Sequence, residues 1–145
     1  MRVTDMPVQC SRSCTSISIY VYCYNLRMKS VQWVGTSRKD VQSFPERVRR
    51  VVGHALYAAQ NSEVDSAAKP LRGFGSAKVM EIVADHDSGT YRSVYTVQFR
   101  EIVYVLHAFQ KKSKQGISTP RRDLELIRSR LSDAARDYKR RLDQE

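Results

Sequence analysis

Three strand-like runs follow one another with very short links, and this feature constrains the fold more than any other. The runs read "KVMEIVA" (78–84), "YRSVYTVQF" (91–99) and "EIVYVLHAF" (101–109). "DHDSG" joins the first two, and a tight turn at residues 100–101 joins the last two. Links as short as these favour antiparallel pairing. We therefore expect a small antiparallel sheet at the centre of the fold.

Two amphipathic helices are expected around this sheet. Ser37 is suited to cap the first, whose apolar residues recur at steps of three and four from Val41 to Ala59, with a bend or break near Pro45. Thr119-Pro120 begins the second. Its apolar stripe comprises Leu124, Ile127, Leu131, Ala135, Tyr138 and Leu142.

"VQWV" (31–34) reads as a further short strand, and residues 61–76 read as a loop rich in small residues. The sum of these elements predicts an α+β fold. In that fold an N-terminal amphipathic helix and a C-terminal basic helix pack on a small antiparallel sheet.

The 145 residues suit a single domain, but the first 27 differ in composition from the rest. "SISIYVYCYNLR" is apolar and aromatic, too short to span a bilayer, and lacks the cleavage site of a secretory signal. Met28 opens a stretch that looks like the start of a compact domain. We expect residues 1–27 to be an extension, poorly ordered, adding a strand or arising from start-codon choice. Residues 28–145 would then form the domain.

Cysteine usage argues against a disulfide or zinc framework in that domain. The three cysteines all lie within residues 1–27, which fits a reducing cytoplasm. Cys10 and Cys14 lack a second ligand pair at zinc spacing, so we expect no metal and no cofactor. A glycine-rich phosphate loop, an HExxH motif and a nucleophile elbow are also missing from the sequence.

The chain is strongly basic, with a formal net charge of +10. Between Lys111 and Arg141, eleven Lys or Arg stand against four Asp or Glu, a net charge of +7. A surface of this kind attracts polyanions: nucleic acid, an acidic protein or an anionic membrane. A solvated basic helix with no such partner is the alternative interpretation.

Three motifs in a fixed order resemble a known family. "KPLRGFGSAKVMEI", "GTYRSVYTV" and "IVYVLHAFQKKSKQGISTP" are similar to the RelE/HigB-like toxins of bacterial toxin–antitoxin modules. The resemblance covers roughly Met28 to Arg141 and is closest to the HigB-like, phage-associated branch. It implies this architecture, cytoplasmic endonucleolytic cleavage of mRNA on the ribosome, and neutralisation by a small antitoxin in a toxin–antitoxin hetero-oligomer. It implies no membrane association.

The resemblance also implies site residues. Arg92 in "YRSVY" matches the arginine that family members place on a central strand facing the scissile phosphate. That role suits arginine, whose planar fork holds two phosphate oxygens while staying charged. Lys112, with Lys111 beside it, matches a basic residue at the end of the last strand. The side chains expected to bind RNA are Lys69, Arg72, Lys78, Lys114, Arg121 and Arg122.

The general base is not defined by the resemblance. RelE carries two lysines in the strand corresponding to 78–84, where this chain has Val79 and Glu81, and its late tyrosine is replaced by Ser118-Thr119-Pro120. His107 is the best-placed acid or base, and a structural role for it stays open. We expect His54 and His86 to be non-catalytic, and Tyr91, Tyr95 and Trp33 to pack rather than bind RNA.

Three functions remain in competition. The first is a ribosome-dependent mRNA endonuclease that inhibits translation without a metal. The second is a ParE-like toxin that shares the fold but inhibits DNA gyrase. The third is a nucleic-acid-binding module that uses only the basic helix. The Arg92 match together with Lys111 and Lys112 favours the nuclease, because an inhibitor that binds protein needs no phosphate-facing cations.

Overall fold

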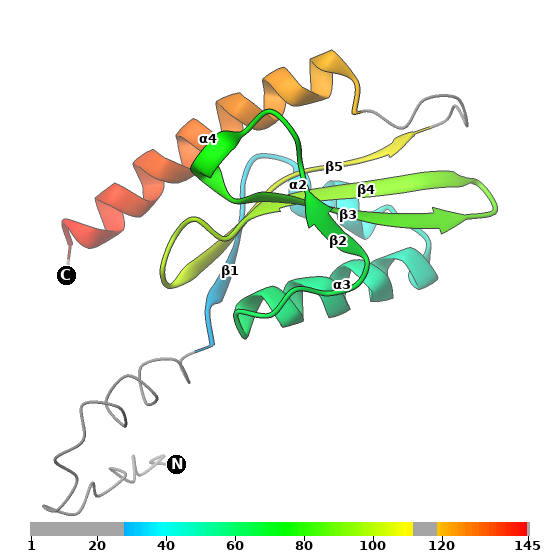
Figure 1. Cartoon of the computed structure of the whole chain (residues 1–145), viewed down its shortest axis with the longest axis horizontal. Helices are drawn as coiled ribbons and strands as arrows, with labels where there is room; N and C mark the ends of the chain where they lie inside the picture. The colour runs from blue at the N-terminus through cyan, green and yellow to red at the C-terminus, as the bar shows by residue number, and fades with distance from the viewer. Residues whose placement is uncertain (1–27, 112–118, 145) are drawn as a thin grey trace, which may run out of the picture.

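A five-stranded sheet forms the centre of the computed structural model, which describes residues 28–111 and 119–144. The strand order is β1-β5-β4-β3-β2 (Figure 1). Along the chain the elements are β1 (Ser30–Trp33), α2 (Ser37–Gln42), α3 (Glu46–Gln60), β2 (Ala68–Pro70), the 3-10 helix η1 (Gly75–Ala77), β3 (Val79–His86), β4 (Gly89–Thr96), β5 (Ile102–Lys111) and α4 (Arg121–Leu142).

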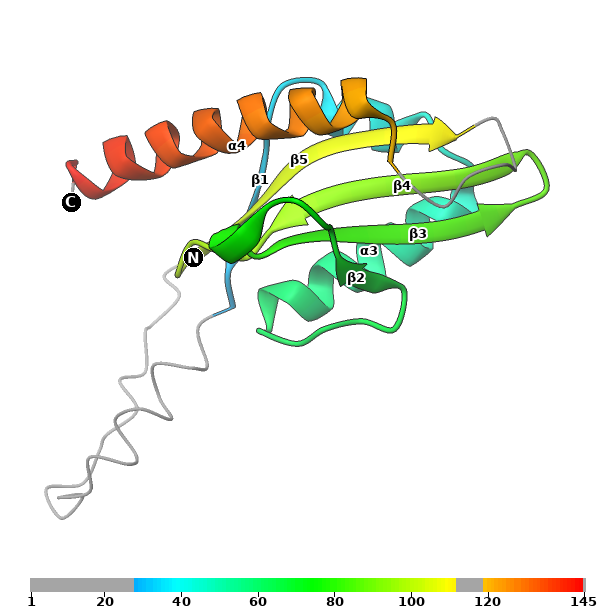
Figure 2. The same ribbon diagram turned by 45° about the horizontal axis from the view of Figure 1, so that its top comes forward.

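Helices cover both faces of the sheet. Helix α3 packs on one face and α4 lies along the other, as the two views of the ribbon show (Figures 1 and 2). Val48, Val52 and Leu56 of α3 share one core with Ile82 of β3 and Tyr95 of β4. Ile127 and Ala134 of α4 share a second core with Leu106 and Tyr104 of β5 and Val94 of β4. Alternation along each strand thus divides its residues between two helical layers.

The expected antiparallel pairing is confirmed for β3, β4 and β5, but the sheet as a whole is mixed rather than antiparallel, because β1 joins it in parallel. Strands β3–β4 and β4–β5 pair antiparallel, whereas β1 runs parallel to β5. Ser30 pairs with Ile102, so the two strands come from distant parts of the chain. No short link constrains their direction, and α2 and α3 carry the chain across one face in between (Figure 1).

The first helical segment is broken at Pro45, as expected, into α2 and α3. The prediction that Ser37 caps the first helix is wrong. Thr36 occupies the N-cap position of α2, and Ser37 is the first helical residue. The buried hydroxyl of Ser37 donates a hydrogen bond to the carbonyl of Val105, 3.0 Å away. Ser37 therefore ties α2 to the sheet instead of capping the helix.

Two other expectations need correction. The stretch 61–76 contains the short strand β2, whose Lys69 pairs with Glu81 of β3. On α4, Ala134 is fully buried whereas Ala135 is exposed, and Leu142 is 52% exposed. The long α4 extends beyond the sheet at its C-terminal end (Figure 2), which leaves Leu142 without a surface to cover it. Within residues 28–111 and 119–144, no helix has the length and apolarity to cross a membrane.

Candidate functional site

A row of polar side chains crosses the sheet on the face that α4 covers. Each of four adjacent strands supplies one: Lys69 from β2, Glu81 from β3, Arg92 from β4 and His107 from β5. Lys69 lies directly opposite Glu81, while Arg92 pairs with Val83, two positions along β3. Period-two alternation places these side chains on the same face of the sheet. We call these four residues the polar row.

Arg92 and Glu81 form a buried ion pair at the centre of the polar row. The Arg92 guanidinium donates to Glu81 Oε2 across 2.8 Å, and the side chains are only 5% and 7% exposed. The Thr119 hydroxyl, just before α4, lies 3.4 Å from the guanidinium and 3.5 Å from the carboxylate. Burial weakens screening by water, so each charge here depends on its partner.

Lys69 adds a second cation to the same carboxylate. Its ammonium lies 3.6 Å from Glu81 Oε1, and its side chain is about half exposed at 49%. Glu81 thus lies between a buried arginine and an exposed lysine. The three groups together carry a net charge of +1, so this part of the row remains attractive to an anion.

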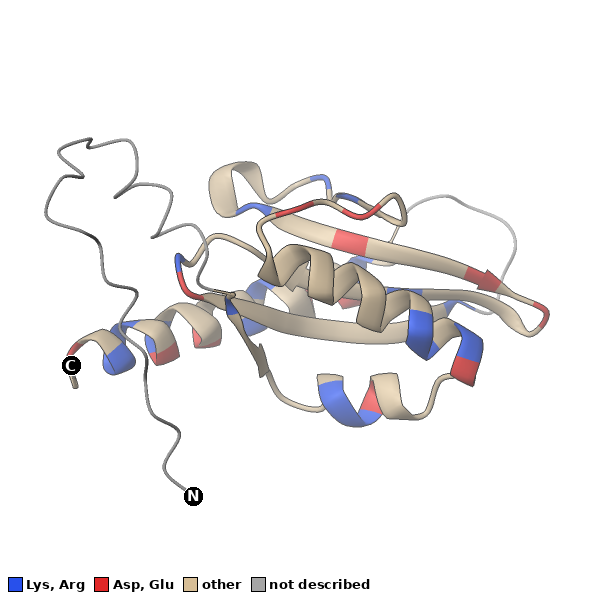
Figure 3. Cartoon of the chain, turned by 90° about the horizontal axis from the view of Figure 1, so that it is seen from below, with Lys and Arg blue, Asp and Glu red and all other residues tan. Residues whose placement is uncertain are grey.

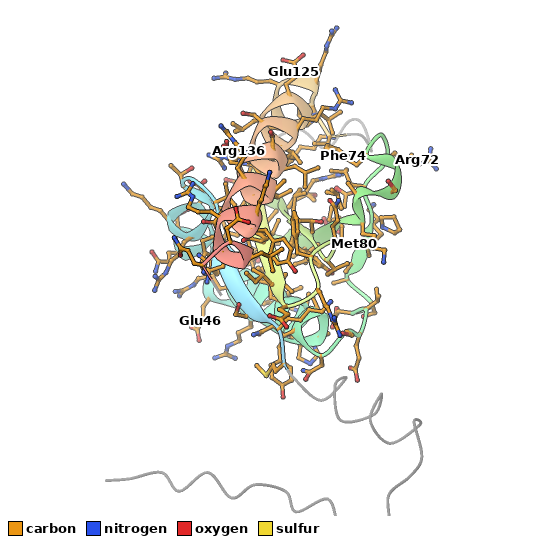
Figure 4. The ribbon with its side chains drawn as sticks, turned by 90° about the vertical axis from the view of Figure 1, so that its left-hand side faces the viewer. Glu46, Arg72, Phe74, Met80, Glu125 and Arg136 are labelled. Atoms are coloured by element: carbon orange, nitrogen blue, oxygen red, sulfur yellow. The ribbon has the colours of Figure 1, made fainter. Side chains whose placement is uncertain are left out.

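A groove of about 760 Å³ opens over this cluster. Glu81 and Thr119 contribute buried side chains to its lining, whereas Lys69 and Arg72 are exposed. Figure 4 shows Arg72 projecting from the molecule near Phe74. The complete lining is Lys69, Pro70, Leu71, Arg72, Glu81, Thr119 and Leu124. The groove therefore combines exposed basic side chains with a buried ion pair beneath them.

His107 is held by partners on both ring nitrogens. Nε2 lies 2.9 Å from Asp123 Oδ1, and Nδ1 lies 3.3 Å from the guanidinium of Arg130. Because arginine can only donate, Nδ1 accepts, and the ring proton on Nε2 is donated to Asp123. The ring also stacks on Phe109, with ring centroids 5.1 Å apart. In this arrangement His107 joins β5 to α4, and neither nitrogen is directed at a substrate.

A β-bulge sets the direction of His107. Val94 pairs with His107 and the next residue, Tyr95, pairs with Val105, so Leu106 is the extra residue in β5. Leu106 packs in the core beneath α4, and its neighbour His107 bonds to Asp123 of the same helix. A bulge re-aims side chains in this way. Regular alternation along β5 would have placed Leu106 and His107 on opposite faces.

Arg130 ties α4 to two other elements. Its guanidinium donates to the carbonyl of Leu106 at 2.9 Å and to the hydroxyl of Thr36 at 3.0 Å. Gly35 permits this approach, since its φ is +58° and an added Cβ would lie 2.9 Å from Arg130 Nε. This one side chain fixes α4 against β5 and the loop before α2.

The remaining predicted site residues do not gather at the groove. Lys78 precedes β3 and Lys111 ends β5, at opposite ends of the strands, and neither lines the groove. Arg121 and Arg122 are exposed at the start of α4, where Arg121 pairs with Glu125. Lys112 and Lys114 lie outside the described residues. The RNA-binding role expected of Lys78 stays a prediction, and it would have to be exerted outside the groove.

The other two histidines contact neighbouring polar side chains, and Tyr95 packs in the core as expected. His54 contacts Asp65 at 2.8 Å on the surface of α3, and His86 contacts Ser88 in the β3–β4 turn. Tyr95 is buried on the α3 side of the sheet, away from Arg92, and burial raises the pKa of its hydroxyl to about 12. The site side chains that sequence reasoning missed are Thr119, Asp123 and Arg130, together with the pairing role of Glu81.

No group of three or more His, Cys, Asp or Glu in the described part of the chain is arranged to hold a metal ion. The polar row and Arg72 together offer two exposed cations at a groove, a buried guanidinium and the carboxylate of Glu81. Such a set suits recognition of a phosphate group, with Lys69 and Arg72 able to meet it first.

Comparison with known proteins assigns the family. Residues 39–132, well over half of the chain, match the model of the "Phage derived protein Gp49-like" family. The chain therefore belongs to this phage-derived Gp49-like family. The match confirms the predicted resemblance to RelE/HigB-like toxins in their phage-associated branch.

A solved structure gives a weaker likeness. It is the crystal structure of the toxin–antitoxin complex RelBE2 from Mycobacterium tuberculosis, one chain of which matches with 24% identity and a TM-score of 0.41. The alignment covers 58% of this chain and 99% of that chain. These values are too low to support a conclusion about function. A search of curated proteins finds no significant match.

Proposed function

We propose that the protein is the toxin of a type II toxin–antitoxin module and acts as a ribosome-dependent mRNA endonuclease. The observation that carries the proposal is the position of Arg92 beneath a groove lined by Lys69 and Arg72, in a chain of the Gp49-like family. The family resemblance implies cleavage without a metal and inhibition of translation. The proposed partners are mRNA, the ribosome and a cognate antitoxin, and the proposed location is the cytoplasm.

In this proposal the groove binds the scissile phosphate and Arg92 stabilises the charge that develops on it. Preorganised positive charge close to the phosphate is often the largest catalytic contribution. Glu81 already occupies the Arg92 guanidinium, so a productive phosphate must take over part of that hydrogen bonding. Lys69 would then compensate the carboxylate of Glu81 from the other side. The exposed cations recruit RNA, and the buried one acts on the reacting group.

The burial of Arg92 favours a second candidate, a ParE-like toxin that inhibits DNA gyrase without cutting RNA. A guanidinium that is 5% exposed and bonded to Glu81 can serve as a structural element alone. In that case the basic groove rim would contact protein. The two functions differ in the molecule that is damaged, so a cellular assay separates them.

The deciding experiment expresses the chain without an antitoxin and maps mRNA 5′ ends during growth arrest. We expect new 5′ ends within translated regions. Lys69→Ala/Arg72→Ala should weaken cleavage. Arg38→Ala/Lys39→Ala serves as the control, because it also removes one lysine and one arginine, from exposed positions on α2. Intact transcripts together with trapped gyrase–DNA complexes would refute the nuclease and support the ParE-like activity.

A further inference from the structure

The exposed face of α3 carries side chains that the fold itself does not use. Arg47, Arg49 and Arg50 lie within the first five residues of the helix and are all exposed. His54 and Tyr57 follow on the outer side, Tyr57 being 57% exposed. Arg47, Arg50, His54 and Tyr57 are spaced by three and four residues, so they form one stripe along the helix. We call Arg47, Arg49, Arg50, Gly53, His54 and Tyr57 the α3 face.

The position of the arginines is electrostatically unfavourable for the helix. The N-terminal end of a helix carries partial positive charge, which favours acidic residues and disfavours basic ones there. Glu46 offsets one arginine, since it pairs with Arg50 at 2.5 Å. Within the described part of the chain, Arg47 and Arg49 form no ion pair. Figure 3, which looks at the sheet from the α3 side, shows this basic end of the helix uncovered.

Gly53 is the second observation. It lies in the middle of α3 on the exposed side, and a Cβ added there would meet nothing within 4 Å. Glycine in a helix interior is less stable than alanine, so the fold alone would favour a side chain here. A glycine that nothing in the fold requires suits the close approach of another molecule's backbone. Gly53 lies one turn from Arg49 and one turn from Tyr57, at the centre of the α3 face.

We propose that the α3 face binds the sugar–phosphate backbone of an RNA duplex. Its arginines would contact phosphates, and Gly53 would admit a ribose to the helix surface. The wide, shallow minor groove of A-form RNA exposes 2′-hydroxyls to such a surface, whereas the minor groove of B-form DNA is narrow. A docked protein helix fits less well, because Tyr57 is the one large apolar side chain that the face exposes.

This surface is separate from the groove over the polar row. Helix α3 packs on the face of the sheet opposite to α4, and the groove lies on the α4 side. One molecule can therefore bind structured RNA through α3 while the groove stays open. The inference goes beyond the proposed cleavage activity and does not depend on it, because its test involves no cleavage.

The test measures binding of the full chain to a fluorescein-labelled RNA duplex of about 16 base pairs by anisotropy over a series of salt concentrations. We expect Arg47→Ala/Arg49→Ala to weaken binding roughly tenfold and to reduce the salt slope by about two, one for each lost phosphate contact. The matched control is Lys139→Ala/Arg140→Ala, which removes two exposed cations from α4. It should have a clearly smaller effect.

Gly53→Ala provides the sharper test, because stability and binding should move in opposite directions. Its Tm should rise by about 2–4 °C, as the helix gains a better helix former, while RNA binding weakens a few-fold. Unchanged RNA binding by Gly53→Ala, or a lower Tm, would overturn the proposal. An equal loss of RNA affinity in the α3 and α4 double variants would also overturn the proposal. Equal affinity of the protein for a DNA duplex of the same sequence would overturn it as well. Stronger binding of polyglutamate than of RNA would assign the face to an acidic protein instead.

Discussion

The guanidinium of Arg92 donates to the carboxylate of Glu81 across 2.8 Å, and both side chains are more than nine-tenths buried. Removing two charges from water is costly, and their mutual attraction offsets that cost only while both are present. The two residues therefore act as a unit. Changing one of them alters stability as well as function, and experiments on Arg92 have to account for this coupling.

Arg92→Ala should lower the free energy of unfolding by about 3–5 kcal/mol, because it leaves Glu81 as a buried charge with its main partner removed. Glu81→Leu/Arg92→Leu removes both charges and should have a stability close to that of the wild type. Urea unfolding of the three proteins measures these differences. Equal destabilisation by the single and double variants would show that the ion pair is not coupled in this way.

The same double variant separates catalysis from folding. If Arg92 stabilises the developing charge on the phosphate, loss of this one preorganised donor should slow cleavage about 100- to 1000-fold. The rate is measured in a reconstituted translation system with folded protein. Near-normal cleavage by Glu81→Leu/Arg92→Leu would remove Arg92 from the active site even if the family activity is correct.

His107→Gln should lower stability by about 1–2 kcal/mol, because Asp123 and Arg130 each lose a hydrogen-bond partner in a site that is largely buried. Since both ring nitrogens are engaged by protein groups, the shape of the pH–rate profile for cleavage should not change. Loss of one limb of that profile in the variant would instead identify His107 as the general acid or base.

Gly35→Ala and Gly75→Ala form a matched pair of substitutions. Both glycines have positive φ, +58° and +53°, so an alanine is strained at either position by about 1–2 kcal/mol. Only at Gly35 does the new Cβ meet Arg130, whose hydrogen bonds to Leu106 and Thr36 it would disturb. Thermal unfolding should therefore show a larger loss of stability for Gly35→Ala than for Gly75→Ala. Equal losses would mean that Arg130 adds nothing to the anchoring of α4.

The contacts of Asp137 with Arg141 and Tyr104 should make stability fall in acid. Hydrogen bonds from Arg141 and then Tyr104 lower the pKa of Asp137 in the folded protein, although burial opposes them. A carboxylate with a lowered folded pKa contributes stability above its unfolded pKa of about 3.9, and this is lost as the pH falls through the folded value. The stability difference between wild type and Asp137→Asn should shrink over that acidic range, as followed by urea unfolding. A constant difference would contradict this linkage.

Local signals in the sequence were sufficient for the elements whose partners are close in the chain. Short links fixed the antiparallel pairing of β3, β4 and β5, and Pro45 marked the break between α2 and α3. The three residues of β2 carry too short a pattern to indicate a strand. Its pairing with β3 and the parallel pairing of β1 with β5 arise from tertiary contacts. Such contacts leave no periodicity in the sequence.

The candidate site likewise divides into residues that local sequence signals predict and contacts that only the tertiary structure shows. The motif identified Arg92, and alternation placed it on the face opposite Tyr95. Its partner Glu81 entered only as a departure from RelE, because neither spacing nor motif predicts an ion pair between β3 and β4. The direction of His107 depends on the bulge at Leu106, and a bulge cannot be read from a continuous apolar run. Knowledge of the pairing register was needed for both.

The parallel contact between β1 and β5 has a consequence for how the protein is made. Ser30 meets Ile102, so the first strand of the sheet has no neighbour until the last strand has been synthesised. Chain segments that are far apart pair slowly, since closing the intervening loop costs entropy. A nascent chain released before β5 is finished lacks the strand that joins β1 to the rest of the sheet. The groove lining also includes Thr119 and Leu124, so the ribosome must translate most of this message before the product can assemble either its sheet or its groove.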